Sequence, residues 1–353
     1  MIPWTWDRIL KAARKFEASD VHLIRGLNPA VRVGGQISFM EGEPLAAEQL
    51  EPLIYGLLND LQKETFLRDW QLCFSRHWPE VGRFRASVYL NAGCPEAAIR
   101  LCETAVRTRD QLHLPEKIDE IARTSTGLVL ITGPTGAGKT TTLNYMVDLI
   151  NQERRAKIIT IEDPIEYVHR HRRSIIVQQE VGTDVQSFRK ALIHALRQNP
   201  DVLVVGEMRD LETMETALTA AETGHLVIAT LHTPDVVQTV QRIYSVFPAE
   251  QQNHIVQQLA NSLQAVLCQR LLPRAGGGGR TLATEFCVVT PAIRNRIRDM
   301  EAHHIYSELQ VGAKRGMHTM DKCLLELYQR GEISYDVAVS NAREPDAIRQ
   351  RSA

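Results

Sequence analysis

The stretch GPTGAGKTTT, residues 133–142, decides the fold of this chain of 353 residues. Four of its residues fit the pattern G-x-x-x-x-G-K-[ST]: Gly133, Gly138, Lys139 and Thr140. The loop leaves the apolar run GLVLIT (127–132), and a helical pattern follows over 139–151. Glycines let backbone N–H groups face phosphate oxygens, and the start of the helix adds partial positive charge. The sequence therefore predicts a strand, a phosphate-binding loop and a helix in succession.

We expect this loop to bind ATP together with Mg²⁺. Lys139 is expected to reach the β- and γ-phosphates, and the hydroxyl of Thr140 to ligate the metal ion. The other loop residues expected to contact the nucleotide are Gly133, Pro134, Thr135, Gly136, Ala137, Gly138 and Thr141. A glycine-rich turn without a ligand is the alternative, and the flanking strand and helix argue against it.

The composition and charge of the chain narrow the classes of partner. The formal net charge of -1 gives no overall attraction to nucleic acid or anionic lipid, so a nucleic-acid partner would need a local basic patch such as 170–173. No apolar run approaches the roughly 20 residues that span a bilayer, and the N-terminus lacks the pattern of a signal peptide. The cysteines form no C-x-x-C pair. We expect a cytoplasmic protein with reduced thiols, no nucleic-acid partner and no direct membrane insertion.

Short apolar runs that alternate with helical patterns predict an α/β fold around a parallel sheet in the middle of the chain. The expected strands are GLVLIT (127–132), KIITIE (157–162), DVLVVG (201–206) and LVIATL (226–231), and the expected helices are 139–151, 187–197 and 213–222. The tail from Ala249 onward is expected to be mostly helical, interrupted by a flexible turn at RAGGGGR (274–280).

The first part of the chain predicts a smaller α+β domain over 1–105, joined by a linker over 106–122 to an ATPase domain over 123–353. Its expected helices are 5–17 and 47–67. Its expected strands are VHLI (21–24), AVRV and QISFM around the turn Gly34-Gly35, and FRASVYL (84–90) and AAIRLC (97–102) around 91–93.

Acidic residues follow two of the expected parallel strands. Glu162 and Asp163 come at the end of KIITIE, with Glu166 shortly after, and Glu207 follows DVLVVG, with Gly206 where a Walker B aspartate usually stands. We expect Glu162, Asp163 and Glu207 to help hold Mg²⁺, Glu166 to act as a further catalytic carboxylate, and Glu207 to orient or deprotonate water. Taken singly, each could be a solvated turn residue.

A histidine ends another expected strand. His232 follows LVIATL, and the carboxyl ends of parallel strands face the crevice in which open α/β sheets bind ligands. We expect it to hydrogen-bond the γ-phosphate, although a lone histidine is often purely structural.

Together these segments resemble the boxes of the secretion and type IV pilus ATPases. GPTGAGKTTT looks like their Walker A box, TIEDPIEYVH like their Asp box, and VVGEMRDLETMETALTAAETGHLVIATLHT like their Walker B and His boxes. ASDVHL and GLNPAVRVGGQI resemble their N-terminal PAS-like domain. PAIRNRIRD (291–299) is similar to the AIRNLIRE box of the pilus retraction, or PilT-type, branch, with Arg296 in place of leucine and Asp299 in place of glutamate.

The resemblance implies a RecA-like P-loop ATPase core, a PAS-like N-terminal domain and a helical C-terminal tail. It also implies a homo-hexameric ring that hydrolyses ATP to power type IV pilus retraction and twitching motility. Partners would be an inner-membrane platform protein and an accessory ATPase. In the family, arginines of the N-terminal domain reach the γ-phosphate. Arg83, Arg85 and Arg100 match those strands, and Arg85 and Arg100 are the favoured pair.

Other functions remain open from the sequence. Within the same superfamily, the chain could be an accessory retraction ATPase or a conjugation or secretion ATPase. A RecA-like nucleic-acid motor is disfavoured by the balanced charge and by the absence of aromatic–basic stripes. A non-catalytic module that binds ATP only to assemble a ring would not need the carboxylates and the histidine described above.

Overall fold

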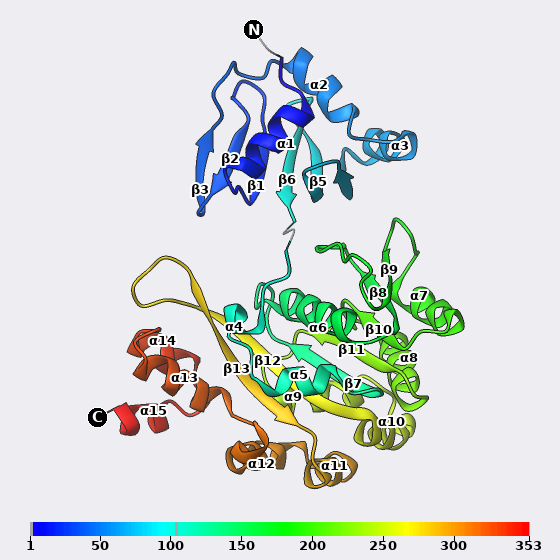
Figure 1. Ribbon diagram of the computed structural model, residues 1–353, viewed down its shortest axis with the longest axis vertical. Coiled ribbons are helices and arrows are strands. Elements are labelled where there is room, and N and C mark those ends of the chain that lie inside the picture. The colour runs from blue at the N-terminus through cyan, green and yellow to red at the C-terminus, as the bar shows by residue number, and fades with distance from the viewer. Residues whose placement is uncertain (1–2, 103–104, 353) are drawn as a thin grey trace. The chain divides into compact units, whose positions relative to one another are not determined.

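The computed structural model describes residues 3–102 and 105–352, which form two compact units (Figure 1). Of these residues, those within 1–105 and 164–168 form the first unit, and those within 106–163 and 169–353 form the second. Residues 103 and 104, beside the predicted domain boundary, lie outside the described part of the chain.

The first unit is an antiparallel sheet of six strands, in the order β3-β2-β1-β6-β5-β4, packed against three helices. Its core includes Leu10 of α1, Leu50 of α2 and Phe84 of β5, all fully or nearly fully buried. The elements are α1 (Trp6–Lys15), β1 (Asp20–Leu23), β2 (Ala30–Val33), β3 (Gln36–Phe39), α2 (Ala47–Tyr55), α3 (Asp60–Asp69), β4 (Gln71–Trp78), β5 (Gly82–Asn91) and β6 (Cys94–Leu101).

Two features of this unit differ from the sequence prediction. The helix expected over 47–67 is divided in two, because Asn59 accepts a hydrogen bond from the backbone of Gln62 and starts a second helix there. Strand β4 was not predicted. It is an edge strand with one buried side chain, Phe74, so its sequence lacks the alternation by which a half-buried strand is detected.

The second unit is built on a sheet of seven strands in the order β13-β12-β7-β11-β10-β8-β9. Successive residues of β7 supply two different cores: Leu128 and Leu130 face one cluster with α7 to α10, while Val129 and Ile131 face another with α5 and α6. Helices therefore cover both faces of the sheet, and the predicted parallel α/β core is confirmed. Its central elements are β7 (Gly127–Thr132), α6 (Lys139–Glu153), β8 (Lys157–Glu162), β9 (Ile175–Glu180), α7 (Phe188–Ala195), β10 (Val202–Val205), α8 (Leu211–Glu222), β11 (Leu226–Leu231), α9 (Val236–Ser245) and α10 (Ala249–Ser262).

The helical prediction for the tail is wrong over residues 263–273 and 281–288, on either side of the predicted turn. This segment forms the long hairpin β12 (Leu263–Pro273) and β13 (Arg280–Val288), with the glycine run as its turn, and β12 pairs in parallel with β7 (Figure 1). Most of its side chains are buried, so the apolar run shows no period that separates strand from helix. Helices do follow the hairpin: α11 (Pro291–Arg298), α12 (Ile305–Val311), α13 (Met320–Gln329), α14 (Tyr335–Asn341) and α15 (Pro345–Ser352).

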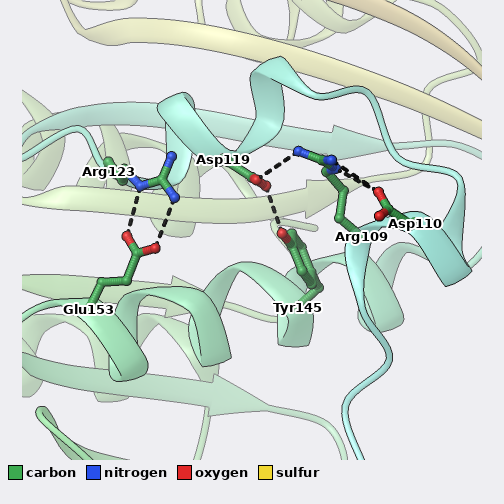
Figure 2. Close-up of polar contacts among 6 residues, drawn as sticks. All are labelled: Arg109, Asp110, Asp119, Arg123, Tyr145 and Glu153. Atoms are coloured by element: carbon green, nitrogen blue, oxygen red, sulfur yellow. Dashed lines mark hydrogen bonds and ion pairs between the residues drawn. The ribbon is translucent and has the colours of Figure 1, made fainter.

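The predicted linker contains two short helices, α4 (Arg109–Leu112) and α5 (Lys117–Ala122), and is part of the second unit. The carboxylate of Asp119 accepts hydrogen bonds from Arg109, at 3.0 Å, and from the hydroxyl of Tyr145 on α6, at 2.6 Å (Figure 2). Arg123 donates two hydrogen bonds to Glu153 at the end of α6, at 2.7 and 2.8 Å. The segment is thus attached along the helix that begins in the glycine loop.

Among the helices that the structure describes, none is long and apolar enough to cross a bilayer.

Candidate active site

Strand register brings the predicted site residues of the second unit to one edge of its sheet. Thr132 of β7 pairs with Leu231 of β11, and Val205 of β10 pairs with both Ala229 of β11 and Ile161 of β8. In parallel strands of matched register the next residues emerge at the same edge. The glycine loop, His232, Glu207 and Glu162 therefore follow neighbouring strand ends.

The glycine loop is closed by the backbone of β12. Gly133 has a φ of +137°, and a Cβ built on it would lie 2.2 Å from the carbonyl oxygen of Gln269. The side chain of Gln269 is buried and donates a hydrogen bond of 2.8 Å to Thr142 of α6. Only glycine fits the first position of the loop here. Sequence reasoning missed Gln269, which lies in a segment predicted to be helical.

Lys139 is folded over the loop that precedes it. Only 9% of its surface is exposed, and Nζ donates to the carbonyl oxygens of Gly133, at 2.8 Å, and Pro134, at 3.0 Å. Burial lowers the pKa of the ammonium, while the charge of Glu207 acts in the opposite direction. The lysine is thus already oriented toward the loop on which phosphate is expected to bind.

His232 joins this lysine to Glu207. Its Nδ1 lies 3.4 Å from Nζ of Lys139, and its Nε2 lies 3.0 Å from Oε1 of Glu207. The ammonium group of Lys139 can only donate hydrogen bonds, so Nδ1 of His232 is the acceptor. The ring proton is then on Nε2, which donates to the carboxylate of Glu207. The structure brings these three predicted residues together.

Glu207 has a second basic neighbour that sequence reasoning missed. Arg209 donates to its Oε2 at 2.8 Å. Partial burial opposes ionisation of Glu207, but the hydrogen bond from Arg209 and the proximity of His232 outweigh it, and the pKa lies below its ordinary value. The side chain is therefore an ionised carboxylate at neutral pH. The only sign of this contact in the sequence was that Arg209 lies two residues after Glu207.

The other predicted carboxylates differ in their burial and belong to both units. Glu162 is 3% exposed at the end of β8, and Asp163 next to it is exposed. Glu166 is exposed in the segment 164–168, which belongs to the first unit.

The residues present fit a Mg²⁺ ion that arrives with a nucleotide. Among the described residues, no group of three or more His, Cys, Asp or Glu could hold a metal ion. Mg²⁺ in nucleotide sites uses one or two protein oxygens, with phosphates and water as its remaining ligands. The half-buried Thr140 in the first turn of α6 and the buried Glu162 are oxygen donors of this kind.

The predicted arginines lie in the first unit. Arg85 of β5 and Arg100 of β6 are direct cross-strand partners, and such partners have their side chains on the same face of a sheet. Asp20 of β1 pairs with Arg100 and accepts from its Nε at 3.0 Å, which offsets the repulsion between the two arginines. Arg83 is half-buried and donates from Nε to the carbonyl oxygen of Ile165 at 3.1 Å.

A model of the family described as type II/IV secretion system protein matches residues 2–330. The chain belongs to that family. Within it, the chain is 43% identical over 338 residues to a type IV pilus retractation ATPase, PilT, of Pseudomonas aeruginosa, covering 96% of this chain and 98% of the relative. It is 36% identical over 344 residues to the type IV pilus ATPase PilU of the same organism, covering 98% and 90%.

A solved structure of a family member has the same fold. The crystal structure of the pilus retraction motor PilT with bound ADP matches with a TM-score of 0.92 at 42% identity, over 98% of this chain and 99% of that one. The resemblance inferred from the motifs is confirmed, and so is the fold class.

The two departures of this family member from the AIRNLIRE pattern lie on the outer side of α11. Arg296 is half-exposed and pairs with Glu301 at 2.8 Å, and Asp299 is exposed at the end of the helix. Ile293 and Ile297, which bury the helix against its neighbours, match the pattern and are 1% and 0% exposed. The substitutions leave the packing face of the helix intact.

Proposed function

We propose that this family member is an ATPase motor that powers retraction of a type IV pilus. The observation that carries the proposal is the contact series Lys139–His232–Glu207 at the glycine loop. It occurs in a chain that aligns with a pilus retraction ATPase over 96% of its own length.

The chemistry is transfer of the γ-phosphoryl group to water. The water oxygen forms a bond to the γ-phosphorus, and the bond to the oxygen between the β- and γ-phosphorus breaks. Glu207 orients this water and accepts its proton, for which its lowered pKa keeps it ionised. Lys139 contacts the phosphates, together with the backbone of the loop 133–141. His232 holds the carboxylate and approaches the γ-phosphate.

Mg²⁺, which shields phosphate charge when bound, would be held by Thr140 and Glu162. Asp163 and Glu207 are the other proposed oxygen donors, and Glu166 is a further catalytic candidate. Among the residues that the structure describes, no group of three or more His, Cys, Asp or Glu side chains could hold the ion, so affinity for the metal should depend on the nucleotide.

We propose that six copies form a ring, with an N-terminal domain over 1–105 and a RecA-like domain over 123–353. Arg85 and Arg100 would act as fingers on the γ-phosphate, and their shared face and exposed side chains support that role. The ring would work in the cytoplasm against a platform protein of the inner membrane.

A second candidate is an accessory retraction ATPase that works beside a main motor. The identity of 36% with PilU, over 98% of this chain, favours it. The two candidates differ in whether the chain alone sustains retraction.

The test is microscopy of living cells with fluorescent pili, in which Glu207→Gln is the only copy of the chain. Pili that extend but no longer retract would support the main motor. Weaker retraction that persists until a second retraction ATPase is deleted would favour the accessory role. Unchanged pilus dynamics would overturn both, and bald cells would indicate an extension motor.

A further inference from the structure

A largely buried series of polar groups joins the end of β8 to the first turn of α6. At one end, Oε1 of Glu162 accepts a hydrogen bond from the hydroxyl of Thr160 at 2.7 Å and another from Nε2 of Gln178 at 3.0 Å. Gln178 lies on β9, the strand that pairs with β8. Two donors at one oxygen fix the plane of the carboxylate.

The series continues through the last residue of the Asp box. Oε1 of Gln178 accepts from the backbone N–H of His169 at 2.8 Å. The ring Nε2 of His169 lies 2.6 Å from Oδ1 of Asn144, and Nδ2 of Asn144 donates to the carbonyl oxygen of Thr140 at 2.8 Å. Every member therefore touches the next within hydrogen-bond distance, from Glu162 to Thr140.

The hydrogen bonds determine which atom of Asn144 and of His169 donates and which accepts. Asn144 uses its amide N–H toward Thr140, so its oxygen accepts from His169 and the ring proton is on Nε2. His169 and Asn144 are 9% and 1% exposed. Burial lowers the pKa of His169 to about 4, which keeps the ring neutral at physiological pH. A buried polar series of this kind holds one arrangement, because each alternative leaves a desolvated group without a partner.

We propose that His169, Asn144 and Gln178 are positioning residues that fix Thr140 relative to Glu162, the two oxygen donors proposed for Mg²⁺. The proposal rests on the proposed function, which supplies the metal ion. Mg²⁺ demands near-octahedral geometry at about 2.0–2.1 Å, so a small shift of either donor weakens its binding. Groups that orient metal ligands typically contribute about 10- to 100-fold in metal affinity.

The alternative role of His169 is purely structural, as a buried residue that only stabilises the fold. In that case its removal would weaken folding and all nucleotide binding alike. Positioning of the metal donors instead predicts a loss that appears only when Mg²⁺ is present. The two roles are separated by measuring affinity with and without the ion.

The experiment measures the dissociation constant of a fluorescent, non-hydrolysable ATP analogue for the full-length protein, in Mg²⁺ and in EDTA. We expect His169→Leu to weaken binding about tenfold or more in Mg²⁺ and to leave binding in EDTA unchanged. His169→Gln, which retains an amide donor, should recover most of the loss. Gln178→Met tests the other end of the series, on a half-buried strand residue, if the histidine variant does not fold.

His318→Leu is the matched control, because this half-buried histidine also lies in the second unit, and its Nε2 is 2.8 Å from the hydroxyl of Thr284, outside the series. Equal losses in Mg²⁺ and EDTA, or no loss in either, would overturn the proposal. Affinity of the wild-type protein that is independent of Mg²⁺ would overturn it together with the proposed metal ligation. Failure of the retraction motor in cells is a separate result, since this measurement needs neither turnover nor a pilus.

Discussion

Nε2 of His232 lies 3.0 Å from Oε1 of Glu207, at the ends of two neighbouring parallel strands. The ring thereby connects the carboxylate proposed to activate water with Lys139 on the glycine loop, 3.4 Å from its other nitrogen. A change at the phosphates that moves the lysine would be transmitted to the carboxylate through one rigid imidazole.

Glu207→Gln should lower the rate of ATP hydrolysis about a hundredfold or more, because the amide cannot accept a proton from water. Binding of ATP should persist, since the loop and Lys139 are unaltered. Phosphate release and binding of a fluorescent nucleotide measure the two effects. Glu212→Gln is the matched control: Glu212 is exposed on α8 and pairs with Arg189 at 3.8 Å. Turnover of the Glu207 variant near that of the control would remove Glu207 from the mechanism.

Arg100→Ala should lower turnover on the order of a thousandfold if this arginine reaches the γ-phosphate as a finger. Arg32→Ala is the control, because Arg32 also lies near Asp20, with its Nε at 3.8 Å, but on the strand on the other side of β1. Steady-state hydrolysis by each purified variant gives the comparison. Similar losses in both would indicate that the arginines serve the N-terminal sheet rather than the nucleotide.

The free energy of unfolding should be about 2 kcal/mol lower at pH 5 than at pH 7 on account of His169. Burial lowers the pKa of its folded form to about 4, and Arg172 adds to this, while Asp148 acts in the opposite direction. The unfolded chain therefore binds a proton that the folded chain does not, so stability is complete above the ordinary pKa of histidine and is lost as the pH falls.

Urea unfolding at several pH values measures the slope of the free energy of unfolding against pH. The pKa of His318 is also lowered by burial, so the wild-type slope contains both histidines. His169→Gln should remove one part of it and His318→Gln the other. If His169→Gln unfolds with the wild-type slope, this histidine is not held neutral in the folded protein.

Tyr145→Phe should reduce the free energy of unfolding by about 1 kcal/mol, because it removes the hydrogen bond to Asp119 from a site that is 8% exposed. Denaturant titration checks the value. Tyr335→Phe, at a side chain that is 38% exposed, provides the comparison. No difference between the two variants would mean that Arg109 alone satisfies Asp119.

The sequence determined the glycine loop and the positions along the chain of the four parallel strands around it. The loop is recognisable because its requirements are local: glycines where the backbone approaches a phosphate, and a helix that starts at Lys139. The four predicted parallel strands are present, since short apolar runs between helices are typical of buried strands. The family follows from the same motifs.

Only the tertiary structure decided which residues meet through strand register, and which strands are buried on both faces of the sheet. The hairpin β12–β13 was missed because a run buried on both faces has no period, and with it Gln269, whose carbonyl closes on Gly133. His169 occupies a place that no spacing rule marks. Its ring contacts Asn144, 25 residues earlier in the chain, and a hydrogen bond between residues distant in sequence leaves no local pattern for a single chain to reveal.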